Sequence, residues 1–353
     1  MSQIKLVATG DVLLHSRVYD ISKKGEKYDF KDKMEPAKTL LQSGDISIVN
    51  LESIVAGEEL GLQSFPRFNN PIELAENLKE LGTDIVTNAN NHSFDLGEEG
   101  LLKSIENLEK IGLPYVGSHK SKADQQKFRV FEKNGIKIGV LAYTAITHKK
   151  NPPKDKEYLL NRIVGGSTMP VRSIVEGTTV PIRTEINRLK KEENVDVVIV
   201  ATHFGPEYTL MPNASQVDIA NSLSDAGADI ILGHHSHVLQ PAQWILNSRG
   251  EKSFVIYSLG NFYSGQKGLY RQIGGALSLT IKKNKNGKVS MEPSMDLTYI
   301  DANRQNNYQM HLFRDYIGKN TSVKTEHGEF DSLEVFSELN NRLTQWVPNF
   351  EIR

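Results

Sequence analysis

Apolar runs alternate with amphipathic stretches along the first third of the chain. Each apolar run is short enough for one buried strand, whereas the stretches between them repeat their apolar residues at the spacing of a helix face. Strands that alternate with helices are typical of βαβ units, so the pattern predicts a largely parallel sheet in an α/β fold. The predicted order is strand 4–10, helix 32–43, strand 45–51, helix 71–81, strand 84–90 and helix 98–112.

The same alternation returns in the second half of the chain and then gives way to antiparallel strands. An Asn-Gly pair favours a tight turn because both residues accommodate a positive φ, and such pairs at 134–135 and 286–287 predict two hairpins. An amphipathic helix over 333–346 is predicted to close the fold. The remaining predicted elements are strands 128–132 and 136–143, helix 183–193, strand 195–201, helix 214–226, strands 229–233 and 253–259, and an antiparallel region over 274–300.

Residues 147–182 interrupt this pattern. They contain prolines and glycines but no sustained period, which indicates a long excursion that could serve as a lid. We assign residues 1–300 to one domain and 301–353 to a C-terminal helical extension packed on that same domain. At 353 residues the chain is long enough to bury a sizeable core.

Residues that bind metals or move protons follow several of the predicted strands. Three imidazoles, His234, His235 and His237, stand directly after strand 229–233. The carboxyl ends of parallel strands are where α/β proteins place their sites, and clustered imidazoles there favour metal coordination or proton transfer over packing. Other strands end in the same way, at Asp11, at Asn50 and Glu52, at Asn91 and His92, and at His203.

Composition narrows the chemistry. The chain has no cysteine, so it has no disulfide, and any metal is held by nitrogen and oxygen ligands. Its net charge of -1 argues against nucleic acid or an anionic membrane surface as a partner, and favours a localised ligand. No segment is long and apolar enough to span a bilayer. We therefore expect a soluble chain that is cytoplasmic, or at the cell surface if an anchor is missing.

The motifs at the strand ends, in their order along the chain, resemble the motif series of calcineurin-like metallophosphoesterases. More closely, they resemble the bacterial capsule synthesis family, the CapA/PgsA group associated with poly-γ-glutamate. The resemblance runs from about residue 4 to about residue 280. The segments that carry it are Gly10-Asp-Val-Leu-Leu14, Asn50-Leu-Glu52, Ala89-Asn-Asn-His-Ser-Phe-Asp-Leu-Gly97, Ala201-Thr-His203, Gly233-His-His-Ser-His-Val-Leu-Gln-Pro241 and Tyr257-Ser-Leu-Gly-Asn-Phe262.

The resemblance implies a four-layer α/β/β/α sandwich and a site for two divalent cations. Two cations about 3.5–4 Å apart polarise a substrate oxygen and lower the pKa of a bridging water. Oxygen and imidazole ligands suit Mn, Fe, Zn or Mg. His92 would protonate the leaving group. The ligands carried over are Glu52 as the bridge, Asp11 and His237 on one cation, and Asn91, His203 and His235 on the other.

Three positions depart from the metallophosphoesterase pattern. The series usually begins with Asp-x-His, but this chain has Asp11-Val-Leu13, which leaves the first cation short of a ligand unless His15 reaches back. Glu52 stands where phosphatases generally have Asp. Ser93 replaces the acid that ordinarily follows the catalytic histidine, with Asp95 as a possible substitute. These departures weaken the prediction of fast phosphoester hydrolysis and leave the fold prediction unchanged.

Four residues are predicted to bind substrate. Arg67 would pair with an anionic group in two-point fashion, and the alternative is a solvent-facing arginine. His234 would face the substrate, Asn261 would hydrogen-bond it or belong to a plain turn, and His15 lies near the first strand end. Asp11 could instead cap a helix, and His203 could be a hydrogen-bonded core residue. The histidines interpreted as solvated are His119, His148, His311 and His327.

Two functions follow from these observations. One is a metal-dependent hydrolase that acts on a phosphoester or on a γ-glutamyl polymer, in the synthesis or export of poly-γ-glutamate. The other is a non-catalytic accessory that grips an anionic polymer through the same cations and supports a capsule synthase complex. A third reading, a sugar- or nucleotide-binding α/β protein with unrelated histidines, predicts that chelation changes nothing. The oligomeric state stays open.

Overall fold

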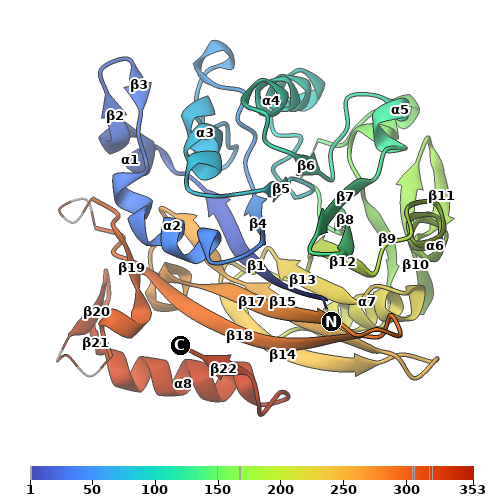
Figure 1. Cartoon of the computed structure of the whole chain (residues 1–353). Helices are drawn as coiled ribbons and strands as arrows, with labels where there is room; N and C mark the ends of the chain where they lie inside the picture. The colour runs from blue at the N-terminus through green and yellow to red at the C-terminus, as the bar shows by residue number, and fades with distance from the viewer. Residues whose placement is uncertain are drawn as a thin grey trace.

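Two large β-sheets carry most of the strands in a computed structural model that describes residues 2–148, 150–166, 168–303, 305, 307–317, 319 and 321–353 (Figure 1). Strand order in the larger sheet is β19-β18-β17-β1-β4-β5-β6, with β16 paired to β1 and β22 paired to β18. Its strands are β1 (Ser2–Leu13), β4 (Ile46–Leu51), β5 (Ile85–Thr87), β6 (Tyr115–Val116), β16 (Asn261–Ser264), β17 (Ile273–Lys283), β18 (Val289–Ile300), β19 (Met310–Leu312) and β22 (Glu351–Ile352).

The second sheet has the order β14-β15-β13-β12-β8-β7. Its four inner strands run parallel, and its two edge strands, β14 and β7, run antiparallel to their neighbours. In the larger sheet β1, β4, β5 and β6 are parallel too. The strands of the second sheet are β7 (Arg129–Lys133), β8 (Ile136–Thr144), β12 (Val197–His203), β13 (Ile230–His234), β14 (Leu239–Leu246) and β15 (Lys252–Leu259).

Helices cover the outer faces of both sheets. Helices α2, α3 and α4 pack on the larger sheet, and α6 and α7 pack on the second sheet. Figure 1 shows α8 on the side of the molecule opposite α3 and α4, next to β14. The helices are α1 (Ser16–Tyr19), α2 (Glu35–Gln42), α3 (Ile72–Glu80), α4 (Gly97–Ile111), α5 (Lys122–Gln125), α6 (Ile182–Glu193), α7 (Ala214–Ala226) and α8 (Ser332–Thr344). Short 3-10 turns are η1 (Asp20–Ser22), η2 (Asp32–Met34), η3 (Glu58–Leu60), η4 (Lys154–Leu159), η5 (Leu269–Gln272) and η6 (Phe313–Asp315).

Alternation along the strands divides the core into three clusters. In β12, Ile199 belongs to the cluster between the sheets, whereas Val198 and Val200 belong to the cluster beneath α6 and α7. In β1, Leu6 faces the second sheet and Val7 faces the helices on the other side. Successive side chains of a strand point to opposite faces, so a strand buried on both faces reads as a continuous apolar run. This confirms the α/β class.

Small strand pairs occupy the connections. Residues 147–182, for which the sequence indicates an excursion, form a three-stranded sheet of β9 (Ile163–Gly166), β10 (Met169–Val175) and β11 (Thr178–Pro181) that contacts α6 and α7. Their role as a lid stays a prediction, and residues 149 and 167 lie outside the described part. The other pairs are β2 (Lys23–Lys24) with β3 (Lys27–Tyr28) and β20 (Ser322–Thr325) with β21 (Gly328–Asp331).

The C-terminal segment packs on the rest of the fold in two ways. Helix α8 lies against β14, and Leu339 and Leu343 join the core cluster between the sheets. Strands β19 and β22 both pair with β18, so the segment also extends the larger sheet. The domain boundary at residue 300 stays a prediction, and residues 304, 306, 318 and 320 of this segment lie outside the described residues.

Strand β14 has no counterpart among the predicted elements. Its sequence begins Leu-Gln-Pro, and proline lacks the N–H that a central strand needs, so the apolar pattern is weak. The segment is a strand because it sits at an edge, next to β15, where one row of backbone groups needs no partner.

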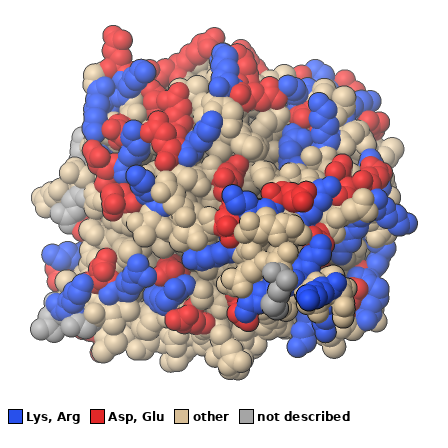
Figure 2. Space-filling model, in the orientation of Figure 1, with Lys and Arg blue, Asp and Glu red and all other residues tan. Residues whose placement is uncertain are grey.

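The helices and the surface charges can be compared with what a membrane or a polyanion would require. Within the described ranges, no helix combines the length and apolar character needed to cross a bilayer. On the face shown in Figure 2, basic and acidic side chains are interspersed, and neither sign forms a continuous stripe.

Candidate metal centre

Parallel strands from both sheets end at one place, where they bring acidic, amide and imidazole side chains together. Asp11 lies in β1 opposite Asn50 of β4, and Glu52 follows β4 directly. From the second sheet, His203 ends β12 opposite His234 at the end of β13. The strand-end prediction therefore agrees with the fold, because the carboxyl ends of parallel strands share one edge.

His203 is the centre of one group of contacts. Its Nε2 lies 2.8 Å from Asn91 Oδ1 and 3.0 Å from His235 Nδ1. The same Nε2 lies 3.3 Å from Glu52 Oε1. These are the four residues for which the resemblance implies the second cation and the bridge, and all four are buried.

His237 and Asp11 form the adjoining group. His237 Nδ1 lies 3.1 Å from Asp11 Oδ2, and His237 Nε2 lies 3.6 Å from Glu52 Oε1. His234 Nδ1 lies 3.4 Å from Asp11 Oδ1. Glu52 Oε1 is therefore shared between the His203 group and the His237 group, as a bridging ligand requires.

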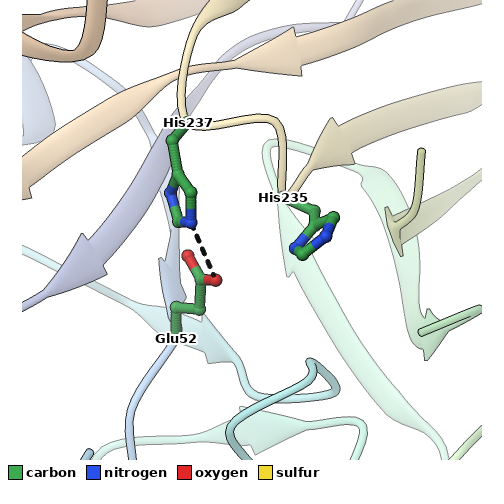
Figure 3. Close-up of side chains that lie close together, drawn as sticks. All are labelled: Glu52, His235 and His237. Atoms are coloured by element: carbon green, nitrogen blue, oxygen red, sulfur yellow. Dashed lines mark ion pairs between the residues drawn. The ribbon is translucent and has the colours of Figure 1, made fainter. Parts of the chain in front are cut away.

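Unpaired polar atoms in this region fit a cation. Both oxygens of Glu52 and Oδ2 of Asp11 are fully buried and have no hydrogen-bond partner among the described residues, which is costly for a carboxylate unless a positive charge compensates. Ligand atoms of Glu52, His235 and His237 lie within 4.8 Å of one another. Figure 3 shows His237 pointing toward the Glu52 carboxylate, with His235 on the other side of the gap. These donors can hold a divalent metal.

Burial and mutual charge set the protonation states. Burial, followed by the Asp11 carboxylate, raises the pKa of Glu52 well above its usual value. Burial would also raise the pKa of Asp11, but His234 and His237 lower it well below its usual value. Burial, followed by the neighbouring His237, lowers the pKa of His235 to about 3. The imidazole of His235 is therefore neutral near pH 7, the form that offers a lone pair to a metal.

Side chains behind the ligands hold them in place. Asn50 Nδ2 donates to Asp11 Oδ1 at 2.8 Å, and Thr87 Oγ1 donates to Asn50 Oδ1 at 3.0 Å. Asn261 Oδ1 lies 3.0 Å from His237 Nδ1. His237 adopts a φ of 59°, a conformation that costs free energy in a residue with a side chain and marks functional loops.

His92 lies beside these groups with an acidic partner. Its Nδ1 is 2.6 Å from Asp95 Oδ2, and the same carboxylate oxygen accepts the Phe68 N–H at 2.7 Å. The structure therefore brings Asp95, the possible substitute for the acid that Ser93 does not supply, into contact with His92, and its role as that acid stays a prediction. Ser93 instead donates its hydroxyl hydrogen to the Asn88 carbonyl and stabilises the turn.

A cleft of about 480 Å³ opens onto the site. His15, Arg67, His92 and His237 are among the residues that line it. The structure shows no contact between His15 and Asp11 within the described residues, and His15 Nδ1 has no hydrogen-bond partner. The other lining residues are Leu13, Phe65, Pro66, Phe68, Asp95, His148, Lys150, Glu207, Tyr208 and Gln266.

Two residues predicted to bind substrate, His234 and Asn261, are buried behind the ligands and do not line the cleft as described. His234 contacts Asp11, and Asn261 contacts His237. Their substrate-binding roles stay predictions. Arg67 lines the cleft and is exposed, so both the anion-binding and the solvent-facing readings remain compatible with its position.

The sequence analysis did not identify two residues that lie at the site, His148 and Glu207. It also assigned the wrong environment to a histidine elsewhere, His119. His148 is exposed but its Nε2 lies 3.0 Å from Asn91 Nδ2, and Glu207 Oε1 lies 3.8 Å from His237 Nε2. Each follows a strand, β8 or β12, by four residues, and that spacing was the available signal. His119 was interpreted as solvated, which is wrong, because it is only 4% exposed and packs beside Asn161.

Two curated proteins with sequences similar to this chain are named as capsule or PGA biosynthesis proteins. The chain is 31% identical over 222 residues to the PGA biosynthesis protein CapA of Bacillus subtilis (strain 168), which covers 61% of this chain and 52% of that protein. It is 28% identical over 279 residues to the capsule biosynthesis protein CapA of Bacillus anthracis, which covers 75% of this chain and 60% of that protein. The chain thus spans about half to three fifths of these relatives' length.

Among solved structures, the chain matches a novel phosphatase from Mycoplasma pneumoniae with a TM-score of 0.44 and 18% identity over 88% of this chain and 92% of that one. The model of the family described as bacterial capsule synthesis protein PGA_cap matches residues 5–266. This match spans well over half of the chain, and the chain therefore belongs to the bacterial capsule synthesis protein family.

Proposed function

We propose that the chain is a divalent-metal-dependent hydrolase of capsule synthesis or export, acting on a phosphoester or on a γ-glutamyl polymer. The observation that carries the proposal is the position of His92, whose ring lines the same cleft as His237 and is held by Asp95. A proton donor beside a cluster of metal ligands is the arrangement that hydrolysis of an ester or amide needs.

Six residues would hold the cations. Glu52 would bridge them, because its Oε1 is the atom common to the contacts of His203 and His237. When bound, the cations supply the positive charge that polarises a substrate oxygen and makes an attacking water more acidic. Mn, Fe, Zn and Mg all suit the oxygen and imidazole donors. With Glu52 as the bridge, one cation would be held by Asp11 and His237. The other would be held by Asn91, His203 and His235.

His92 would handle the proton of the departing group. The Asp95 carboxylate accepts a hydrogen bond from Nδ1, which fixes the ring and leaves Nε2 as the nitrogen that exchanges a proton with substrate. Asp95 is held in turn by the Phe68 N–H. The departing oxygen or nitrogen would take its proton from His92, and the attacking water would lose one to solvent.

Cleft residues favour an anionic substrate with an apolar portion. Arg67 and Lys150 are exposed basic residues in the lining, and they suit phosphate or carboxylate groups. Phe65 is 76% exposed in the same lining, and burying such a ring against a ligand releases ordered water.

The same basic residues would favour the second candidate, a non-catalytic accessory that binds an anionic polymer and supports a synthase complex. Leu13, in place of an imidazole, also favours it.

Hydrolysis assays of the full chain separate the two candidates. The protein is loaded with Mn²⁺ and assayed on bis(p-nitrophenyl) phosphate and on poly-γ-glutamate. Under the hydrolase proposal His92→Ala lowers kcat by about 1,000-fold and leaves the metal content intact, whereas His327→Ala, at an exposed histidine, changes neither. Binding of poly-γ-glutamate without turnover in Mn²⁺, Fe²⁺, Zn²⁺ and Mg²⁺ would instead establish the accessory.

Asp95→Asn tests the role of the acid separately. We expect kcat to fall by about 100-fold with little change in KM, because the amide no longer fixes the protonation and orientation of His92. The double variant with His92→Ala should be no slower than His92→Ala alone, since the two residues act as a unit. Additive losses would contradict that role.

A further inference from the structure

We propose that Glu207 is a ligand of the cation held by His237 and Glu52, an assignment that rests on the metal-dependent function proposed above. Glu207 stands in the loop after β12 and was not among the residues that the motifs point to. Its carboxylate faces the open side of the site, toward the cleft. Glu207 would therefore bind the cation from the side on which substrate enters.

The hydrogen bonds around His237 fix which ring nitrogen carries the proton. Asn261 Nδ2 donates to the Arg271 carbonyl at 2.9 Å, so the atom that Asn261 turns toward His237 is its oxygen. His237 Nδ1 then lies between two acceptors, Asn261 Oδ1 at 3.0 Å and Asp11 Oδ2 at 3.1 Å. A hydrogen on Nδ1 suits both acceptors, and Nε2 is then the ring nitrogen that can offer a lone pair to a metal.

The lone pair of His237 Nε2 faces two carboxylates. Glu52 Oε1 lies 3.6 Å away and Glu207 Oε1 lies 3.8 Å away. Both separations are too long for hydrogen bonds, so a protonated Nε2 would satisfy neither oxygen. Ligand atoms at about 2.1 Å from one cation lie about 3–3.5 Å from one another. The two separations from His237 are slightly longer than this, and Glu207 would join the group formed by Glu52, His235 and His237 by turning its exposed carboxylate inward. Glu52 is completely buried and neither of its oxygens has a hydrogen-bond partner in the part of the chain that the structure describes, which independently favours a positive charge at this point.

Backbone contacts tie Glu207 to the loop that carries the histidines. The N–H of the next residue, Tyr208, donates to the Ser236 carbonyl at 2.8 Å. The guanidinium of Arg271 stacks over the Tyr208 ring at 4.9 Å. The Glu207 side chain is 42% exposed, so it is free to turn toward the cation from the cleft side. Because Leu13 offers no ligand atom, a carboxylate from this loop would complete the shell.

Titration calorimetry of the chelator-treated full chain with MnCl₂ tests the assignment. We expect Glu207→Gln to weaken Mn²⁺ binding by at least about tenfold, because the amide keeps the shape and loses the charge. Glu26→Gln, the same change at an exposed turn, should leave the affinity unchanged. Thermal unfolding of the metal-free proteins should be equal for wild type and Glu207→Gln, which shows that folding is intact.

Two outcomes overturn the assignment while leaving the proposed function standing. One is a wild-type affinity, within twofold, in Glu207→Gln. The other is a loss that disappears in 0.5 M NaCl, because a screened loss identifies a rim charge and not a ligand. A wild-type chain that takes up no Mn²⁺ would overturn both this assignment and the metal-dependent function.

Discussion

His119 shows how a single polar residue depends on its surroundings. The ring is buried, and its Nε2 lies 3.2 Å from Asn161 Oδ1. Burial, opposed by the charge of Asp124, lowers the pKa of His119 to about 4. The folded chain therefore binds this proton less readily than the unfolded chain does. The stability that the neutral ring contributes is complete above pH 6.5, declines as the pH falls below 6.5, and is fully lost once the pH has fallen through about 4.

His119→Gln should make the metal-free protein less sensitive to acid. Between pH 7 and pH 5 the free energy of unfolding of the wild type should fall by about 2 kcal/mol more than that of the variant, because the variant lacks the imidazole of residue 119 and the other buried histidines are common to both proteins. Urea denaturation at both pH values in the presence of chelator measures the difference. Parallel losses in the two proteins would show that His119 does not respond to acid in this range.

Residue type and position predicted much of the candidate site. Asp11, Glu52 and His203 were identified because acidic and imidazole side chains directly after apolar runs are unusual, and the fold brings them together. Glu207 and His148 were missed because they lie several residues beyond the strands, where loop geometry decides which way a side chain turns. Sequence spacing carries no information on that geometry.

Glycines at the strand ends let the backbones meet beneath the site. A Cβ on Gly10 would lie 2.0 Å from the Gly260 carbonyl oxygen, and one on Gly233 would lie 2.0 Å from the Tyr257 carbonyl oxygen. Gly10 precedes Asp11, whose N–H donates to that same Gly260 carbonyl at 2.8 Å. The close approach of β1 to the backbone at Gly260 therefore fixes the position of Asp11.

Gly10→Ala should destabilise the fold and disturb the site together. The new methyl group would meet rigid backbone, so we expect a loss of about 3 kcal/mol or more in the free energy of unfolding. Gly25→Ala is the control. Its φ of 66° makes alanine strained but its surroundings are open, and the expected loss is about 1 kcal/mol. Urea denaturation compares them, and equal losses would refute the close-approach argument.

Element types were predicted better than element boundaries. Helices α4 and α7 and both Asn-Gly hairpins agree with the sequence pattern, because long amphipathic periods and positive-φ turns are local signals. The edge strand β14 and the sheet formed by β9, β10 and β11 were not predicted. Their strands are short or interrupted by proline, and their partners come from the tertiary fold.

At the scale of the whole molecule, the C-terminal segment is part of the core. Leu343, Phe350 and Ile352 join the cluster between the sheets. The backbone of Arg353 exchanges hydrogen bonds with β18, donating to the Met295 carbonyl at 2.8 Å and accepting the Leu297 N–H at 2.7 Å. Removing the segment would expose apolar surface of both sheets.

A chain that ends at residue 300 should lose cooperative unfolding. Thermal unfolding followed by circular dichroism measures this, with Leu343→Ala in the full chain as the graded comparison. That variant should lose about 2–5 kcal/mol because its side chain is completely buried. A truncated chain that unfolds cooperatively at the wild-type temperature would show that the segment is dispensable.

The central claim is that side chains from both sheets converge to hold divalent cations. Elemental analysis of the protein, purified without added metal or chelator, tests it most directly. The account predicts about two divalent ions per folded chain. The double variant His203→Ala and His237→Ala should carry none. A folded wild-type chain with no bound transition metal or magnesium, and no uptake on dialysis against Mn²⁺, would contradict the account.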